Sequence, residues 1–288
     1  PVITNEALAR AGTVIEAGHE DNGTVVAGTV SATGTLTASD VDADATRTWS
    51  VIGTPGAVTG TVDAASTTYG SMAIDANSGV WTYTLDNDKA ATQALKENET
   101  VTQRYVARVT DDKGAYVDQT VTVTIRGTND VPVITNDATA RAGTVIEAGH
   151  NDDGTVVAGT VSASGTLTAS DVDADATRTW SVIGTPGAVT GTVDAASTTY
   201  GSMAIDANSG VWTYTLDNDK AATQALKENE TVTQRYVARV TDDKGAYVDQ
   251  TVTVTIRGTN DVPVITNDAT ARAGTVIEAG HNDDGTVV

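Results

Sequence analysis

The sequence predicts an all-β protein made of tandem Greek-key β-sandwich domains, each with at most one short helix. Thr and Val, which favour pleated strands, are abundant, and so are Gly and Asp, which favour turns. Short alternating runs are separated by turn residues, as is typical of a sandwich. The segment that opens at Pro1 also returns at Pro132 and Pro263, so the period is 131 residues, the size of a whole domain.

The two complete copies are nearly identical. We therefore predict one domain over residues 1–130 and a second over residues 131–261. Residues 262–288 repeat the start of a domain without the rest of it. This predicts that the tail packs on the preceding domain, with a boundary that is split across the repeat or out of phase with it. The aligned copies differ only at Glu6/Asp137, Leu8/Thr139, Glu20/Asn151, Asn22/Asp153 and Thr33/Ser164.

The first strands of each period come from Thr- and Val-rich runs. Gly28–Ala38 holds one or two strands. Thr46–Ile52 alternates and places Trp49 and Val51 on one face. The low aromatic content leaves the core to aliphatic side chains and a few aromatic anchors.

A hairpin is predicted next. Gly70–Asp75 and Val80–Leu85 flank an Ala-Asn-Ser-Gly turn. In the second arm Trp81, Tyr83 and Leu85 share a face, which predicts that they point into the core.

A short helix and a second hairpin complete the period. Lys89–Leu95 predicts about two helical turns, with Asn87 or Asp88 as N-cap. Val101–Thr110 is predicted to be a strand and Tyr116–Ile125 its hairpin partner. The following Thr-Asn-Asp-Val-Pro segment is a linker too short for independent tumbling, so successive domains should share an interface.

Composition excludes several functions. The net charge of −21 argues against nucleic acid and anionic lipid as partners. No run is apolar enough to insert in a membrane, and no cysteine is present for a disulfide or thiolate site. The histidines are three copies of one position, and no phosphate loop or nucleophile elbow occurs. We therefore predict that the chain is not an enzyme.

Acidic clusters suggest a hard cation such as Ca²⁺. Asp40, Asp42 and Asp44 recur as Asp171, Asp173 and Asp175. Alternate residues of an extended segment point the same way, so unpaired carboxylates there repel and a divalent cation relieves the repulsion. The spacing is not that of an EF-hand, because Ala45 and Val51 stand where Gly and Glu are required. The alternative is an acidic turn capped by its own backbone.

Three further clusters recur. Asn129 and Asp130, like Asn260 and Asp261, flank the linker and form either a simple turn or one site shared with the next domain's aspartates. Asp111-Asp112, repeated as Asp242-Asp243, is an ordinary hairpin turn unless it lies beside the Asp40 run. Glu16 with residues 20–23, and Glu147 with residues 151–154, suit either a loop or a loose site.

Four segments, GTLTASDVDADATRTWSV, YGSMAIDANSGVWTYTLDND, ALKENETVTQRYVARVTDDKGA and VTVTIRGTNDVPVI, resemble the VCBS repeats of giant bacterial RTX adhesins. The resemblance covers essentially the whole period. It implies cadherin-like or bacterial Ig-like domains, type I secretion and display on the extracellular bacterial cell surface. Such arrays are extenders, stiffened by calcium at their junctions, that project a ligand-binding tip for adhesion and biofilm formation.

The resemblance extends to single residues. Asn129-Asp130 resembles the Asn-Asp of the cadherin linker, and Asp171 and Asp173 resemble the aspartates that the following domain offers. Glu147 matches the glutamate of the N-terminal cadherin strand only in part, and Val131 stands where the full linker motif continues. The expected partners are adjacent repeats of the same chain and calcium ions, in a monomer. The alternative function is a glycan- or surface-binding adhesin module, for which Trp49 and Trp81 are the candidate platform.

Overall fold

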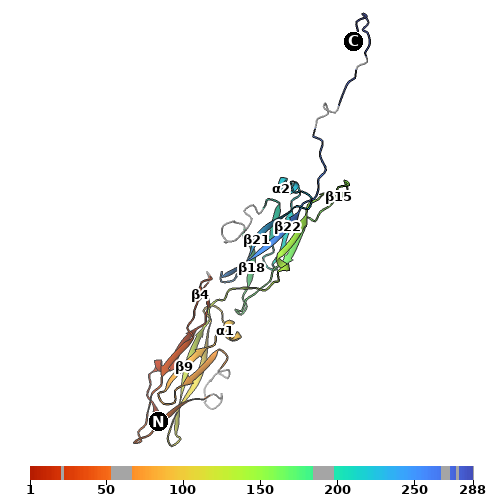
Figure 1. The fold of residues 1–288 in the computed structure, drawn as a ribbon. Coiled ribbons are helices and arrows are strands. Elements are labelled where there is room, and N and C mark those ends of the chain that lie inside the picture. The colour runs from red at the N-terminus through yellow and green to blue at the C-terminus, as the bar shows by residue number, and fades with distance from the viewer. Residues whose placement is uncertain (21–22, 53–66, 184–197, 267–272, 277–278, 288) are drawn as a thin grey trace.

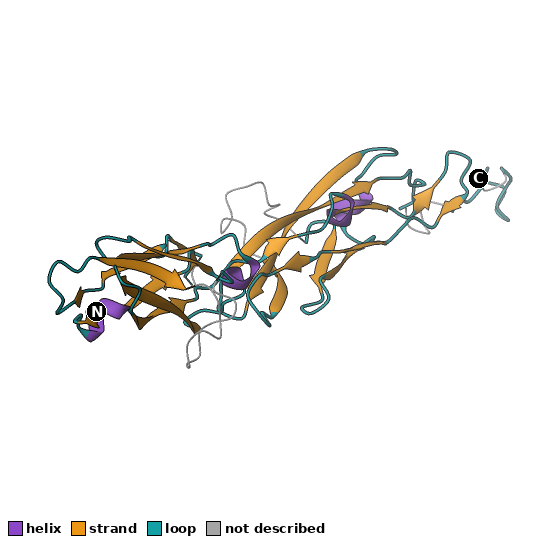
Figure 2. Cartoon of the chain, turned by 90° about the horizontal axis from the view of Figure 1, so that it is seen from below, coloured by secondary structure: helices purple, strands orange, loops and turns teal. Residues whose placement is uncertain are grey.

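The computed structural model describes residues 1–20, 23–52, 67–183, 198–266, 273–276 and 279–287. Two β-sandwich domains follow one another end to end, and the two ends of the chain lie at opposite ends of the molecule (Figure 1). Among these residues, the strands of each sheet all come from one repeat. The predicted all-β tandem sandwich is confirmed, and Figure 2 shows both domains as successive layers of strands.

A four-stranded sheet forms one layer of the first domain. Its order is β2 (Ala11–Ile15), β11 (Tyr116–Arg126), β10 (Thr100–Asp111) and β7 (Arg47–Ile52). The long hairpin β10–β11 is antiparallel, whereas β2 runs parallel to β11. Because β2 and β11 run in the same direction, both finish at the same end of the sandwich, where the linker also begins.

The second layer has three strands, in the order β5 (Ser31–Thr35), β9 (Val80–Leu85) and β8 (Gly70–Ile74). The chain crosses between layers from β5 to β7 and again from β7 to β8, which is the Greek-key pattern. Two small ribbons close the ends of the domain. They pair β1 (Val2–Ile3) with β6 (Ala38–Ser39), and β3 (Gly18–His19) with β4 (Val25–Val26).

The second domain repeats this arrangement. Its four-stranded sheet is β13 (Ala142–Ile146), β22 (Tyr247–Arg257), β21 (Thr231–Asp242) and β18 (Arg178–Ile183). Its three-stranded sheet is β16 (Ser162–Thr166), β20 (Val211–Leu216) and β19 (Gly201–Ile205). Its ribbons are β12 (Val133–Ile134) with β17 (Ala169–Ser170), and β14 (Gly149–His150) with β15 (Val156–Val157).

The predicted inward faces form the core. Trp81 and Tyr83 are 0% exposed and Trp49 is 5% exposed. The indole N–H of Trp81 donates to the carbonyl of Ala9 at 2.7 Å, which satisfies its polar atom. A Cβ on Gly12 would meet the Trp81 ring at 2.8 Å, so only glycine allows β2 to pack there. The two tryptophans are therefore core anchors, and they offer no exposed platform for a glycan.

The helical prediction is correct in place but too long. α1 (Ala90–Gln93) and its copy α2 (Ala221–Gln224) each make about one turn, and 3₁₀ turns form at Ala7–Arg10 and Thr139–Arg141. The N-cap of α1 is Lys89, so the assignment of the cap to Asn87 or Asp88 is wrong. The Asn87 side chain instead accepts a hydrogen bond from the Ala17 N–H at 2.9 Å. No helix among the described residues is long and apolar enough to cross a membrane.

The C-terminal segment leads away from the second domain (Figure 1). Its described apolar side chains are largely exposed, as Val264 (80%) and Val276 (96%) illustrate. The packing of residues 262–288 on the preceding domain, and an out-of-phase boundary, stay predictions.

Candidate metal centre

The linker is held against the first domain by β3, the short strand that follows β2. After β11 ends at Arg126, the carbonyl of Asn129 accepts a hydrogen bond from the His19 N–H at 2.6 Å. The imidazole Nδ1 of His19 lies 3.8 Å from a carboxylate oxygen of Asp130. These contacts fix the orientation in which Asn129 and Asp130 leave the first domain. Asn129 is only 3% exposed, although it lies in a linker.

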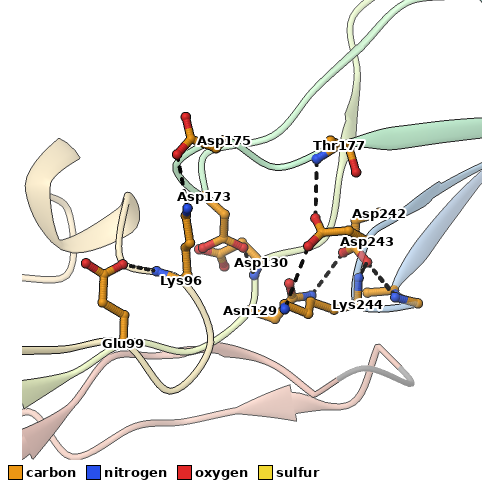
Figure 3. Close-up of polar contacts among 12 residues, drawn as sticks. Lys96, Glu99, Asn129, Asp130, Asp173, Asp175, Thr177, Asp242, Asp243 and Lys244 are labelled. Atoms are coloured by element: carbon orange, nitrogen blue, oxygen red, sulfur yellow. Dashed lines mark hydrogen bonds and ion pairs between the residues drawn. The ribbon is translucent and has the colours of Figure 1, made fainter. Parts of the chain in front are cut away.

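The second domain meets this linker with the turn that follows β17. Asp171 Oδ1 accepts a hydrogen bond from the Asp173 N–H at 3.2 Å, which holds the turn in shape. Asp173 Oδ2 in turn accepts the N–H of Asp130 at 2.8 Å, a direct bond between the domains. Figure 3 shows the Asp130 and Asp173 side chains facing each other at the middle of the junction.

The hairpin turn of the second domain lies beside the same cluster. Asp242 Oδ1 accepts three N–H groups of its own turn, at 2.7–2.9 Å. Its Oδ2 accepts the side-chain amide of Asn129 at 3.0 Å. This hairpin turn therefore lies beside the aspartate run of the same domain. Because both Asp242 oxygens already have partners, Asp242 mainly fixes Asn129 and has little capacity left for an ion.

Three carboxylate oxygens at the junction are buried without a hydrogen-bond partner. They are Asp130 Oδ2, Asp171 Oδ2 and Asp173 Oδ1. Buried polar atoms are normally paired, and a buried anionic oxygen without a donor or cation is costly. One unsatisfied oxygen from the first domain and two from the second therefore form a set of hard oxygen donors of the kind that Ca²⁺ prefers.

Glu16 joins this cluster from the end of β2. It is fully buried; its carboxylate accepts the Thr128 N–H at 3.2 Å and the Gln93 amide at 3.3 Å. The sequence placed Glu16 only in a loop or loose site and favoured Glu147 as the strand glutamate. The repeat itself held the missing signal, because Glu16 and Glu147 are one position in two copies.

The electrostatics record this crowding. Burial, together with repulsion from the carboxylates of Asp130 and Asp173, raises the pKa of Glu16 to about 8. Burial likewise raises the pKa of Asp173 to about 7, with repulsion from Asp130 and Asp171 adding to the effect. The pKa values of Asp130 and Asp171 are also raised, in both cases first by burial. Only His19 acts in the opposite direction on Asp130.

The first domain carries a copy of this aspartate run at its opposite end, where no described domain packs on it. There the N-terminal ammonium of Pro1 lies 2.9 Å from Asp40, the counterpart of Asp171. Its hydrogen bond lowers the pKa of Asp40, whereas burial raises that of Asp171. Asp42 is exposed, whereas its counterpart Asp173 is 8% exposed.

The remaining predicted ligands of these clusters do not belong to the set of unsatisfied buried oxygens. Asp44 is exposed, and Asp175 turns outward to the Lys96 ammonium at 3.1 Å. Asp112 pairs with its neighbour Lys113 at 2.9 Å. The side chains of three exposed turn residues, Asp44, Asp112 and Asp175, are therefore separate from the buried oxygens. Two further candidates lie in the hairpin turns. Asp111 accepts backbone N–H groups of its own turn, and Asp243 accepts the Thr177 N–H at 3.3 Å.

The last predicted ligands form a third group at the far end of the second domain. Glu147 accepts the Thr259 N–H at 3.0 Å, and Asp261 helps to raise its pKa after burial. The His150 strand residue bridges to Asn260 there, as His19 does to Asn129. This group matches the first-domain half of the junction, and no described residue faces it from a third domain. Within the described residues, no group of three or more acidic or histidine side chains is assembled closely enough to hold a metal ion as it stands.

Comparison with known proteins adds a likeness of fold. Neither a protein-family model nor a curated protein matches the chain. It is similar to human CDH23 EC21-23, with 14% identity over 86% of this chain and 72% of that one and a TM-score of 0.40. It is also similar to the human desmocollin-1 ectodomain (15% identity, 90% and 42% covered, TM-score 0.34) and to protocadherin gamma B2 extracellular cadherin domains 3–6 (14%, 91% and 53%, 0.37).

The chain therefore spans about half the length of the second and third of these structures. The class that the chain's own sheets define is a tandem of β-sandwich domains, and these units resemble cadherin domains in fold at low identity. The likeness concerns the fold alone, and the properties of the junction rest on its own contacts.

The raised pKa values make the cation-free junction sensitive to pH. An unfolded Glu16 or Asp173 ionises at its ordinary pKa, near 4, whereas the folded groups hold their protons to about 8 and 7. The folded state then binds more protons, so its stability is highest at low pH and falls as pH rises from about 4 to 8. For Glu16 alone the fall is about 1.4 kcal/mol per pH unit within this window.

Urea unfolding in chelator between pH 5 and 8 measures this slope. Glu16→Gln should flatten it, because the amide stays neutral. Glu147→Gln is the matched control and should flatten it less, since fewer carboxylates face that side chain. A wild-type stability that is constant over this range would contradict the expectation.

Proposed function

We propose that this chain is a non-catalytic extender segment of an extracellular bacterial adhesin of the VCBS type, stiffened by calcium at its domain junctions. The observation that carries the proposal is the set of three partnerless buried carboxylate oxygens on Asp130, Asp171 and Asp173. They come from both domains, so any cation they hold also ties the domains together.

The residues at the junction have distinct parts in this proposal. Asp130, Asp171 and Asp173 would hold the ion, with Glu16 as a further carboxylate donor once it loses its proton. Asn129 and Asp242 position the linker against the second domain through their hydrogen bond. The cation supplies positive charge that cancels the repulsion among these carboxylates.

The same arrangement predicts a looser joint without calcium. Glu16 and Asp173 then stay neutral by keeping protons, or they ionise and repel their neighbours. Extracellular calcium modules commonly bind at ~10⁻⁴–10⁻³ M, so the joint would be loose in the cytosol and stiff outside the cell.

The extender role is supported by the end-to-end order of the domains (Figure 1) and by the near-identity of the repeats. Each added copy lengthens the rod and adds another identical junction. The partners in this proposal are the adjacent repeats of the same chain, and the segment itself is a monomer. Export by type I secretion and display at the bacterial surface follow from the resemblance to VCBS repeats.

Small-angle scattering with calcium and with chelator tests the proposal. We expect the maximum dimension to be sharply defined in calcium and the ensemble to become broader and more bent in chelator, because the junction carboxylates then repel. Magnesium at the same ionic strength is the control, since its small octahedral shell suits this carboxylate set poorly. Identical scattering profiles and melting temperatures in calcium and chelator would refute the proposal.

A further inference from the structure

The junction has a second set of contacts, separate from the carboxylate cluster. The carbonyl of Ala94, directly after α1, accepts a hydrogen bond from the Ala174 N–H of the next domain at 3.2 Å. Two residues further on, the Lys96 ammonium lies 3.1 Å from the Asp175 carboxylate. In the view of Figure 3, Lys96 and Asp175 lie on one side of the Asp130–Asp173 pair and Asn129 on the other. We name the four residues Ala94, Lys96, Ala174 and Asp175 the clasp.

The repeat provides an internal comparison for the clasp. Lys96 is partly buried at the junction, whereas its copy Lys227, which no described domain faces, is exposed. Val172 is 48% exposed, and its copy Val41 is 96% exposed. Lys96 and Val172 are therefore less exposed than their copies, whereas the Asp175 side chain of the clasp is 89% exposed. A cavity of about 50 Å³ beside the clasp is lined from both domains, including Lys96 and Asp175.

The clasp does not depend on a cation. None of its polar groups is among the unsatisfied oxygens, because the Asp175 carboxylate already has the Lys96 ammonium and the two backbone groups bond to each other. The turn that presents Asp175 is also formed in advance. Asp175 and its copy Asp44 both have a positive φ, of 57° and 62°, with and without a neighbouring domain.

We infer that the clasp is a cation-independent contact surface that fixes the rotation of one domain about the linker relative to the next. A linker alone leaves this rotation free, whereas contacts at two separate places, the clasp and the Asn129–Asp242 hydrogen bond, restrict it. Lys96 is a positioning residue in this surface. Its ammonium pairs with Asp175 and is also attracted by Asp243, and both aspartates belong to the second domain. The inference rests on the proposed rod function only for its biological purpose, because the contacts themselves need no ion.

Distances between two spin labels test the inference directly. The chain has no cysteine, so Thr120→Cys and Thr251→Cys introduce the only labelling sites, at equivalent exposed positions on β11 and β22. In chelator at low salt, we expect the otherwise wild-type chain to give a distance distribution that is wider than in calcium, because the joint can bend, but still restricted, because the clasp limits rotation. Lys96→Glu should give a markedly broader distribution, since like charges then face each other. Raising the salt should broaden the distribution of the otherwise wild-type chain, because salt screens the exposed Lys96–Asp175 pair.

Two controls separate the clasp from other causes. Lys227→Glu makes the same change where no described domain faces the side chain and should leave the distribution as it was. Lys96→Glu combined with Asp175→Lys restores the opposite charges and should restore the narrow distribution. A Lys96→Glu chain that is as narrow as its parent in chelator, or a Lys227→Glu chain that is equally broad, would overturn the inference. Failure of added calcium to narrow the Lys96→Glu chain would instead count against the calcium joint and leave the clasp standing.

Discussion

Replacing Asp173 by Asn is expected to remove most of the stabilisation that calcium gives to this chain. Asp173 contributes an unsatisfied buried oxygen and accepts the linker N–H of Asp130 at 2.8 Å. An amide can still accept that hydrogen bond, but it no longer carries the charge that attracts the ion. The substitution therefore separates cation binding from the contact between the domains. Relief of repulsion should also leave the chelated variant at least as stable as the chelated wild type.

The size of this effect follows from mass action. With 10 mM free calcium and a dissociation constant of ~10⁻⁴–10⁻³ M, binding to the folded state alone stabilises it by about 1.4 to 2.7 kcal/mol per site. Urea unfolding with and without calcium measures the difference for each variant. The matched control is Asp42→Asn, which changes the same position at the exposed end of the first domain. Equal loss of the calcium effect in both variants would show that the junction is not the site.

Replacing Trp81 by Ala should give the largest loss of stability, confined to the first domain. Trp81 is 0% exposed, and its N–H has a carbonyl partner at 2.7 Å, so the variant loses packing, leaves a cavity and removes the hydrogen bond to the partly buried Ala9 carbonyl. Such changes cost about 3 to 5 kcal/mol. This is a large part of the ~5–15 kcal/mol that holds a typical domain together.

Calorimetry can resolve this effect because the repeats act as references for each other. The near-identical wild-type domains should unfold close together, whereas Trp81→Ala should split the profile and move one transition down by roughly 10 °C or more. Trp212→Ala, the same change in the second domain, should split it similarly. Leu8→Ala is the control, since Leu8 is 84% exposed and its loss should hardly move either transition. A single unshifted transition for Trp81→Ala would contradict the assignment of this side chain to the core.

Local pattern was sufficient for most of the fold. The alternation of Trp81, Tyr83 and Leu85 placed all three in the core, because successive strand residues point to opposite faces. Residues Gly70–Ile74 and Val80–Leu85 form the hairpin that their turn sequence predicted. The cap of α1 was predicted wrongly because Asn87 is bound by the distant Ala17, which a local pattern cannot reveal.

The candidate site was predictable in composition but not in membership. The spacing of the aspartates and the Asn-Asp linker indicated oxygen donors near each junction. That Glu16 is the junction glutamate, and that Asp242 is occupied by its own turn and by Asn129, depends on the parallel pairing of β2 with β11 and on the packing of two domains. The Glu16–Thr128 and Asn129–Asp242 hydrogen bonds join residues more than 100 positions apart.

The sequence by itself determined the repeat, the strand-rich sandwich, the inward faces and the residues able to bind a cation, because each depends on local periodicity and side-chain chemistry. Tertiary structure alone decided which copy of each acidic position matters. Asp42 and Asp173 have the same neighbours in sequence, yet one is exposed and the other is buried with a pKa of about 7. The physical reason is desolvation, because the first domain packs against Asp173 and removes its water, whereas Asp42 stays in solvent.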